Sequence, residues 1–232
     1  MSEYRHEYKY ICAAKQLALI GNNIRGLMQP DKYAQDGKGY TVRSLYFDDY
    51  GDSCLYDNIN GNDPREKFRV RIYNADVSYI CLELKRKEKG KTRKRSCRID
   101  ETLCREMMQG RPLKMDAMDA DIYRKFCLWQ NERLLQPKVI VEYDRIPYVY
   151  KDGNVRVTFD MNIRSGGNVE GFLDNMLITR PVMPLNQHVL EVKFDELIPD
   201  FLYAAVQTEK LRQTTYSKYY ICRKYNSEGI KL

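Results

Sequence analysis

The sequence is poor in histidine and contains no Cys-x-x-Cys pair. Only His6 and His188 occur among 232 residues, and the seven cysteines lie singly along the chain. Zinc sites use Cys and His ligands at short spacings, so no zinc site is expected. A Ser-His-Asp or Cys-His catalytic triad is also unexpected, because so few histidines are present to act as the base.

Two common phosphate-binding motifs are missing as well. The chain has no GxxxxGK[ST] loop and no GxGxxG sequence that opens a helix. The Gly166–Gly167 pair is typical of a simple turn. The usual glycine-rich cradles for phosphate are therefore absent, and any phosphate site has to use other groups.

Long hydrophobic segments are also absent. No apolar run approaches the roughly 20 residues that cross a bilayer, and the opening sequence MSEYRHEYKY is polar. An odd number of cysteines without a leader segment is typical of reduced thiols. We therefore expect a cytoplasmic protein without a transmembrane segment.

What the chain does have is an ordinary globular composition with an excess of positive charge. Hydrophobic residues make up 43%, and 39 Lys plus Arg against 32 Asp plus Glu give a net charge of +7. This excess favours an anionic partner without naming one. We found no internal repeat, low-complexity tract or linker, so residues 1–232 are predicted to form a single domain.

Strand patterns dominate, and helices lie between them. Alternation and turn residues predict about eight strands, over residues 3–11, 40–48, 65–73, 79–87, 92–99, 138–150, 154–160 and 188–195. Helical periodicity or a helix-start signal predicts helices over 13–28, from Asp100, over 116–135 and over 199–211, and residues 216–225 close the chain. Strands in meander order predict an antiparallel barrel or a strongly curved sheet.

Several of these strands are charged on one face and apolar on the other. In REKFRVRIY, Arg65, Lys67, Arg69 and Arg71 share a face, and the apolar residues between them share the opposite one. The same division occurs in EYRHEYKY, YICLELK, VRVTFD and HVLEVKFD, whose ionisable residues include Arg5, Glu7, Lys9, Glu83, Lys85, Arg156, Asp160, Glu191, Lys193 and Asp195.

Two interpretations of this pattern are open. A sheet can simply expose one charged face to water. Alternatively, the predicted helices cover the apolar faces from outside, and the charged faces line the lumen of a closed sheet. A lumen of Lys and Arg with a few carboxylates would bind a polyanion, since Arg and Lys neutralise phosphoryl charge and carboxylates bind Mg²⁺ or Mn²⁺.

The order of these segments resembles the VTC domain, the polyphosphate polymerase module of the vacuolar transporter chaperone family. The matching pieces are RHEYKY, VRSLYFDD, REKFRVRIY, LELKRK, KTRKR, VEYDRIPY, VRVTFD, LEVKFD and TYSKYY, which span residues 5–220. This family belongs with the CYTH-like triphosphate tunnel enzymes. The resemblance implies an α+β fold, an eight-stranded antiparallel β-barrel tunnel with helices packed outside.

The resemblance also implies roles for individual residues. The residues expected to act on the transferring phosphoryl group are Arg69, Arg71, Lys85, Arg145, Arg156 and Lys218. Those expected to bind substrate phosphates are Lys9, Lys94, Tyr143 and Ser217, to which we add Lys193 from the face of Glu191. The resemblance makes Glu191 a metal ligand, and Glu7 and Glu83 are further candidates.

Some positions have a second interpretation. Lys94 lies in a basic run with Arg93 and Arg95, so it could belong to an exposed cationic stretch. Glu7 and Glu83 could equally be salt-bridge partners. For Asp160 a structural role is favoured over a role in the site. Ser217 could be only a helix cap. Tyr143 and Arg145 share a face with Val139 and Val141, so alternation alone does not select them.

The expected activity is transfer of the ATP γ-phosphate to a growing polyphosphate chain with Mn²⁺ or Mg²⁺. ATP, triphosphate and polyphosphate are the expected ligands. The opening Glu7-x-Lys9, in place of the ExExK of CYTH hydrolases, favours the polymerase branch. A triphosphatase on the same tunnel is the alternative. A non-catalytic module that binds polyphosphate or nucleic acid is a third possibility, but nucleic acid is not expected because carboxylates share the cationic faces.

Overall fold

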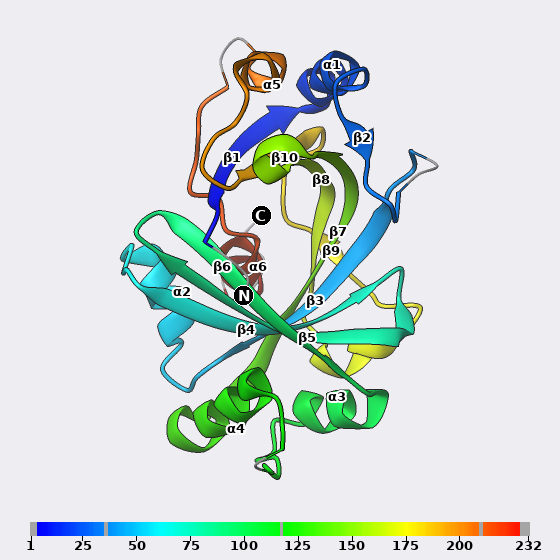
Figure 1. Ribbon diagram of the computed structural model, residues 1–232. Helices are drawn as coiled ribbons and strands as arrows, with labels where there is room; N and C mark the ends of the chain where they lie inside the picture. Colours follow the sequence, from blue (N-terminus) through cyan, green and yellow to red (C-terminus); the bar gives the residue numbers. More distant parts are fainter. Residues whose placement is uncertain (1–3, 35–36, 117, 209–210, 228–232) are drawn as a thin grey trace.

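The computed structural model describes residues 4–34, 37–116, 118–208 and 211–227 (Figure 1). Ten strands in these ranges form one antiparallel sheet. They are β1 (His6–Ala13), β2 (Gln29–Pro30), β3 (Tyr40–Asp48), β4 (Arg65–Tyr73), β5 (Asp76–Glu88), β6 (Lys91–Ile99), β7 (Gln136–Tyr150), β8 (Val155–Gly166), β9 (Arg180–Pro181) and β10 (Gln187–Phe194).

The strand order is β1-β10-β8-β7-β3-β4-β5-β6, and the short β2 and β9 pair with β7 and β8. The predicted meander order is therefore wrong for part of the sheet. Strands joined by short turns, such as β4 with β5 and β7 with β8, are neighbours as predicted. Strands joined through helices or long loops are not, since β3 pairs with β7 and β1 with β10. A short turn forces its two strands together, whereas a long connection leaves the partner open.

The sheet curls until its two end strands approach each other. Arg5, just before β1, forms a single bridge to Thr92 on β6, with backbone N···O distances of 2.9 and 2.8 Å. The eight main strands thus surround a lumen, which Figure 1 views from one end. The predicted antiparallel barrel is confirmed, with a closure between β1 and β6 that is limited to this bridge in the described residues.

Six α-helices and two short 3₁₀ helices occur in the described residues. They are α1 (Ala14–Ile24), α2 (Ser53–Ile59), α3 (Glu101–Met108), α4 (Asp121–Arg133), α5 (Asp200–Val206), α6 (Lys218–Ser227), η1 (Asp152–Asn154) and η2 (Val169–Leu173). Helix α2 was not predicted. It begins where the Asp48 carboxylate accepts hydrogen bonds from the backbone N–H groups of Cys54 and Leu55, both near 3 Å. Helices α1 and α5 end several residues earlier than predicted.

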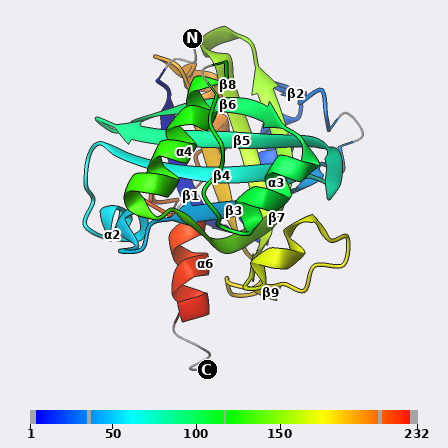
Figure 2. The same ribbon diagram turned by 90° about the horizontal axis from the view of Figure 1, so that it is seen from below.

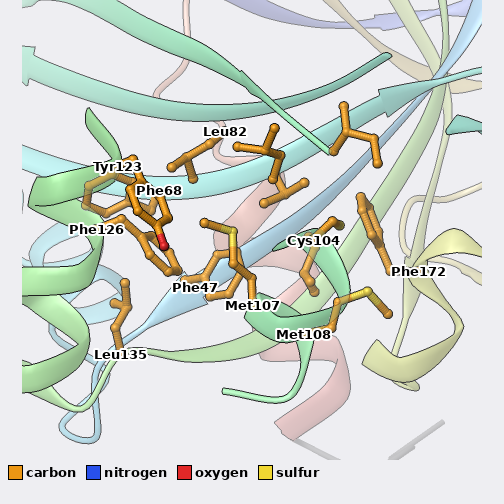
Figure 3. Packing of buried hydrophobic residues seen from close by; sticks show 14 of the residues in the cluster. Phe47, Phe68, Leu82, Cys104, Met107, Met108, Tyr123, Phe126, Leu135 and Phe172 are labelled. Carbon is orange, nitrogen blue, oxygen red and sulfur yellow. The ribbon is translucent and has the colours of Figure 1, made fainter. Parts of the chain in front are cut away.

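The apolar faces of the strands point away from the lumen and are covered by helices. Helices α3 and α4 pack over β4 and β5, where Phe126 meets Phe47 and Phe68 edge-to-face at 4.9 and 5.2 Å (Figure 3). Helices α1 and α5 cover the other side of the barrel, over β1, β8 and β10. This burial leaves the charged strand faces on the inside, because alternate residues of a strand point to opposite faces.

Helix α6 closes one end of the barrel. It lies behind the opening in Figure 1 and extends from that end in Figure 2. Tyr219 and Cys222 pack there against lumen-facing residues, among them Val139 and Val141 of β7. One end of the lumen is therefore apolar and filled, and the rest is polar. This explains why Tyr143 and Arg145 share a strand face with valines.

Candidate functional site

Two adjoining cavities occupy the polar part of the lumen. The first has a volume of about 260 Å³ and the second about 510 Å³. Both are lined by the same central set, which is Arg69, Arg71, Lys85, Thr92, Arg145 and Lys193. The two cavities thus adjoin at a cationic centre, and together we call them the cationic tunnel.

Most of the predicted site residues meet in this tunnel. The first cavity is lined by Glu7, Lys9, Arg69, Arg71, Lys85, Tyr143, Arg145, Glu191, Lys193, Ser217 and Lys218. The second cavity adds Lys94 and Arg156. Arg93, which precedes Lys94 in the basic run, also lines the second cavity. The chemical roles of the predicted residues stay predictions. Alternation predicted the shared strand faces of Glu7, Lys9, Arg69, Arg71, Lys85, Arg156, Glu191 and Lys193, whereas Lys94, Tyr143, Arg145, Ser217 and Lys218 came from the resemblance.

Glu191 is the carboxylate with the most cationic neighbours in the first cavity. Its oxygens lie 2.8 Å from Lys193 Nζ and 2.7 Å from Lys218 Nζ, with Lys9 and Arg145 at 3.8 and 3.6 Å. Burial alone would raise the pKa of Glu191, but these cations hold it well below its usual value. The group is therefore ionised over the whole physiological range.

Glu7 projects from β1 into the first cavity. Its carboxylate lies 2.6 Å from Lys85 Nζ and 3.6 Å from Lys193 Nζ. Lys85, Lys9 and Lys193 overcome the effect of burial and keep the pKa of Glu7 well below its usual value. Glu7 and Glu191 thus share Lys9 and Lys193 as neighbours and supply two anionic groups to one cavity.

Glu83 lies on the lumen face of β5, opposite Arg69 of β4, but its cationic partners cover it. Only 1% of the residue is exposed, and it lines neither cavity. Its oxygens contact Arg69 at 2.6 Å and Lys94 at 2.8 Å, and both of these cations line the second cavity. This geometry matches the salt-bridge interpretation, since Glu83 holds two predicted phosphate-binding cations in place.

A second buried carboxylate supports Arg145 and Lys218. Asp160 is fully buried and accepts two hydrogen bonds from Arg145, at 2.6 and 2.7 Å. Lys218 Nζ lies 2.6 Å from the same carboxylate. Asp160 therefore fixes the orientation of two predicted cations from β7 and α6, which agrees with its structural interpretation.

Other supporting groups could not be found from alternation. Arg156 contacts the carboxylate of Asp31 at 3.2 Å and the hydroxyl of Tyr40 at 3.2 Å, and Asp31 lies in a loop. Ser217 accepts a hydrogen bond from the backbone N–H of Tyr220 at 3.3 Å, so it caps α6 while also lining the first cavity. Lys67 was not among the predicted site residues, although it shares the face of Arg69 and lines the first cavity.

The carboxylates fit a divalent metal that is bound together with phosphate. No group of three or more His, Cys, Asp or Glu at metal-binding spacing occurs in the described part of the chain. Mg²⁺ is commonly held by one or two carboxylates and substrate phosphates, with water completing the coordination. Glu191 and Glu7 supply that number of carboxylates at the wall of the first cavity.

Two lysines of the tunnel are expected to make ligand binding depend on pH. Burial lowers the pKa of Lys85 to about 7 despite the opposing effect of Glu7, and burial lowers the pKa of Lys67 to about 8. A polyanion binds the protonated lysines, so tripolyphosphate affinity should fall as pH rises from about 7 to 9. Each lysine that titrates contributes at most about tenfold per pH unit.

Calorimetry across this pH range, in two buffers of different ionisation enthalpy, measures both the affinity and the proton uptake. Lys85→Arg keeps the positive charge at every pH of the series and should flatten the pH dependence. An identical pH dependence in the two proteins would show that Lys85 does not titrate on binding.

An antiparallel barrel with helices outside and a cation-lined lumen defines the class of triphosphate tunnel proteins. The VTC domain family matches residues 4–226, and the chain belongs to this family. A comparison with curated proteins gave no match. Membership in this family indicates a function related to polyphosphate or triphosphate.

The solved structures that resemble the chain have low sequence identity to it. HpAC1 from Hippeastrum, described as a candidate adenylyl cyclase with a dominant triphosphatase activity, has a TM-score of 0.57 at 15% identity, with 96% of each chain covered. A protein from Pyrococcus horikoshii has a TM-score of 0.46 at 15% identity, with 95% of this chain and 99% of that chain covered. In the described residues, no helix combines the length and the apolar character that a membrane crossing requires.

Proposed function

We propose that this chain is a polyphosphate polymerase that transfers the γ-phosphate of ATP to a growing polyphosphate chain in the cationic tunnel. The observation that carries the proposal is that one set of cations lines two adjoining cavities. A phosphoryl group held by the central set has cationic walls on both sides. One side can hold the donor triphosphate and the other an acceptor made of phosphate.

The chain's own residues have to position the reactants and stabilise charge. Phosphoryl transfer asks a protein for little covalent chemistry, and its transition state spreads negative charge over the equatorial oxygens. Arg69, Arg71 and Arg145 can donate several hydrogen bonds each to such oxygens. Their carboxylate partners, Glu83 and Asp160, hold the guanidinium groups in fixed positions before the substrate binds.

A covalent phospho-enzyme is not part of the proposal. Burial raises the pKa of Cys12 and Cys97 to about 11, so these thiols are protonated at neutral pH. None of the seven cysteines lines either cavity. The proposed reaction is direct transfer between phosphates, which requires no nucleophilic side chain.

Glu191 and Glu7 would hold Mn²⁺ or Mg²⁺, which when bound neutralises phosphate oxygens and polarises the transferring group. In the absence of substrate these carboxylates are paired with lysines. The same lysines are free to turn toward phosphate once a cation occupies the carboxylates. The proposal therefore gives Lys85 and Lys193 phosphate-binding roles.

The proposal is tested by incubating the protein with ATP and Mn²⁺ and separating the products by size. Phosphate chains that lengthen with time are expected. Release of orthophosphate alone would contradict the polymerase and support a triphosphatase, in which water attacks.

The variant Arg69→Ala should lower both tripolyphosphate affinity and turnover, with turnover falling by about 100- to 1,000-fold. Arg69 donates to Tyr46 and Glu83 at the tunnel wall, and loss of one preorganised donor has an effect of this size in other enzymes. Arg98→Ala is the matched control, because Arg98 is an exposed strand residue that lines neither tunnel cavity. Equal activity of Arg69→Ala and Arg98→Ala would remove Arg69 from the site.

A further inference from the structure

The series of cations on the lumen face of β4 ends in a tyrosine. Arg69 and Arg71 occupy alternate positions of this strand, and Tyr73 is the next alternate residue. Tyr73 lines the second cavity, together with Tyr40 of the neighbouring strand β3. Alternate residues of a strand are about 7 Å apart, so an aromatic ring follows the two guanidinium groups at one such step. The wall of the tunnel thus changes from cationic to aromatic toward the last residue of β4.

Tyr40 and Tyr73 form one unit, which we call the aromatic rim. Their rings pack edge-to-face, with centroids 5.5 Å apart. The hydroxyl of Tyr40 accepts a hydrogen bond from Arg156 at 3.2 Å, which fixes the ring at the cavity wall. Both residues are only half-buried. The rim is therefore held in place by the protein and still has ring surface that a ligand can contact.

The tyrosines of the first cavity are arranged differently. Tyr46, Tyr143 and Tyr219 line that cavity, but they are 6%, 3% and 1% exposed. Tyr8 packs edge-to-face on Phe194 at 5.2 Å. Tyr216, which precedes α6, is the other half-buried tyrosine at this wall, and it has no tyrosine partner like that of the rim in the described residues. It is therefore the natural comparison for the aromatic rim.

The second cavity has the size and the wall groups that a nucleoside requires. Its volume of about 510 Å³ lies within the range of small-molecule pockets, roughly 300–1,000 Å³. Arg93 and Arg156 add guanidinium groups, which stack on aromatic rings as tyrosine does. Asn154 and Asp195 add polar atoms that can bind hydroxyl groups or a base edge. An inorganic tripolyphosphate uses the cations of this wall but has no group for the aromatic rim.

We propose that the aromatic rim is a nucleobase subsite, so that the donor nucleotide lies with its base at the rim and its phosphates at Arg69 and Arg71. The inference rests on the proposed function and names the part of the donor that is recognised outside the triphosphate. In this orientation the phosphates point from the second cavity toward the first. Glu7 and Glu191, the proposed metal ligands, line the first cavity, where the terminal phosphates would arrive.

The test compares ATP with inorganic tripolyphosphate by calorimetry in the absence of metal. Tyr73→Leu should lower ATP affinity by about tenfold, because stacking of a base on an aromatic side chain is lost. Its tripolyphosphate affinity should change by less than about threefold, which also shows that the variant is folded. Tyr73→Phe keeps the ring and should bind both ligands as the unmodified protein does. The matched control Tyr216→Leu removes a half-buried tyrosine from the first cavity and should leave the ratio of the two affinities unchanged.

Nuclear magnetic resonance gives a measurement that needs no variant. Saturation of tyrosine ring protons in the unmodified protein should transfer to the adenine protons of ATP more strongly than to the ribose protons. Weaker transfer to adenine than to ribose would overturn the subsite. Equal loss of affinity for both ligands in Tyr73→Leu, no loss for either, or a selective loss of ATP affinity in Tyr216→Leu instead, would also overturn it while leaving the proposed function intact. Failure of the unmodified protein to bind either ligand would overturn the proposed function and the subsite together.

Discussion

Glu191→Gln is expected to lower turnover with ATP and Mn²⁺ by about a thousandfold or more. The substitution keeps the size of the side chain but removes the charge that the proposal assigns to the metal. A metal contribution of several kcal/mol corresponds to several orders of magnitude in rate. Initial rates at saturating Mn²⁺ and ATP measure the effect.

Nucleotide affinity should behave differently from turnover. Glu191 lies close to Lys9, Arg145, Lys193 and Lys218, and its loss leaves these cations in place for phosphate. Affinity for ATP should therefore be retained or increased. Glu196→Gln serves as the matched control, since the side chain of Glu196 is 79% exposed and pairs only with Lys91 in the described residues. Full activity of Glu191→Gln at saturating Mn²⁺ would refute the metal assignment.

Asp160→Ala is expected to lower the free energy of unfolding by about 3–5 kcal/mol. Asp160 is fully buried against Arg145 and Lys218, and removing one partner of a buried ion pair leaves charge without compensation. Burial opposes the charged form of Asp160, yet Arg145 and Lys218 keep its pKa below the usual value, so the pairing operates at neutral pH. Urea unfolding at pH 7 measures the loss.

Asp195→Ala provides the comparison on an exposed pair. Asp195 contacts Arg5 at 2.9 Å, but both side chains are partly exposed to water. Pairs of this kind contribute about 0–1 kcal/mol, so the control should stay close to the unmodified protein. A loss below about 1 kcal/mol in Asp160→Ala would show that Glu191 alone neutralises Arg145 and Lys218.

The alternation of the sequence determined much of the strand structure. Strands β3 and β4 have the predicted bounds, and in β4 the apolar Phe68, Val70 and Ile72 alternate with arginines. The same alternation placed Arg65, Lys67, Arg69 and Arg71 together on one face. A period of two is a local property of an extended chain, so it can be read without knowing the neighbouring strands.

The sequence predicted only part of the set of charged residues that line the tunnel. Alternation brought Glu7, Lys85 and Glu191 to the lumen, and the resemblance to the VTC domain added Tyr143 and Arg145. Alternation did not distinguish Glu83, which is covered by Arg69 and Lys94, from Glu191, which lines the first cavity. Both carboxylates share a face with cations, and only their depth relative to neighbouring side chains separates them.

The sequence by itself thus determined an antiparallel sheet with one charged face and helices to cover the other. The tertiary structure decided the strand order, the closure between Arg5 and Thr92, and the position of α6 at one end of the lumen. It also decided that Asp31 supports Arg156 and that β4 and β5 oppose like charges. These features depend on pairings between distant segments, which are set by closure of the whole barrel and not by the local pattern of any one strand.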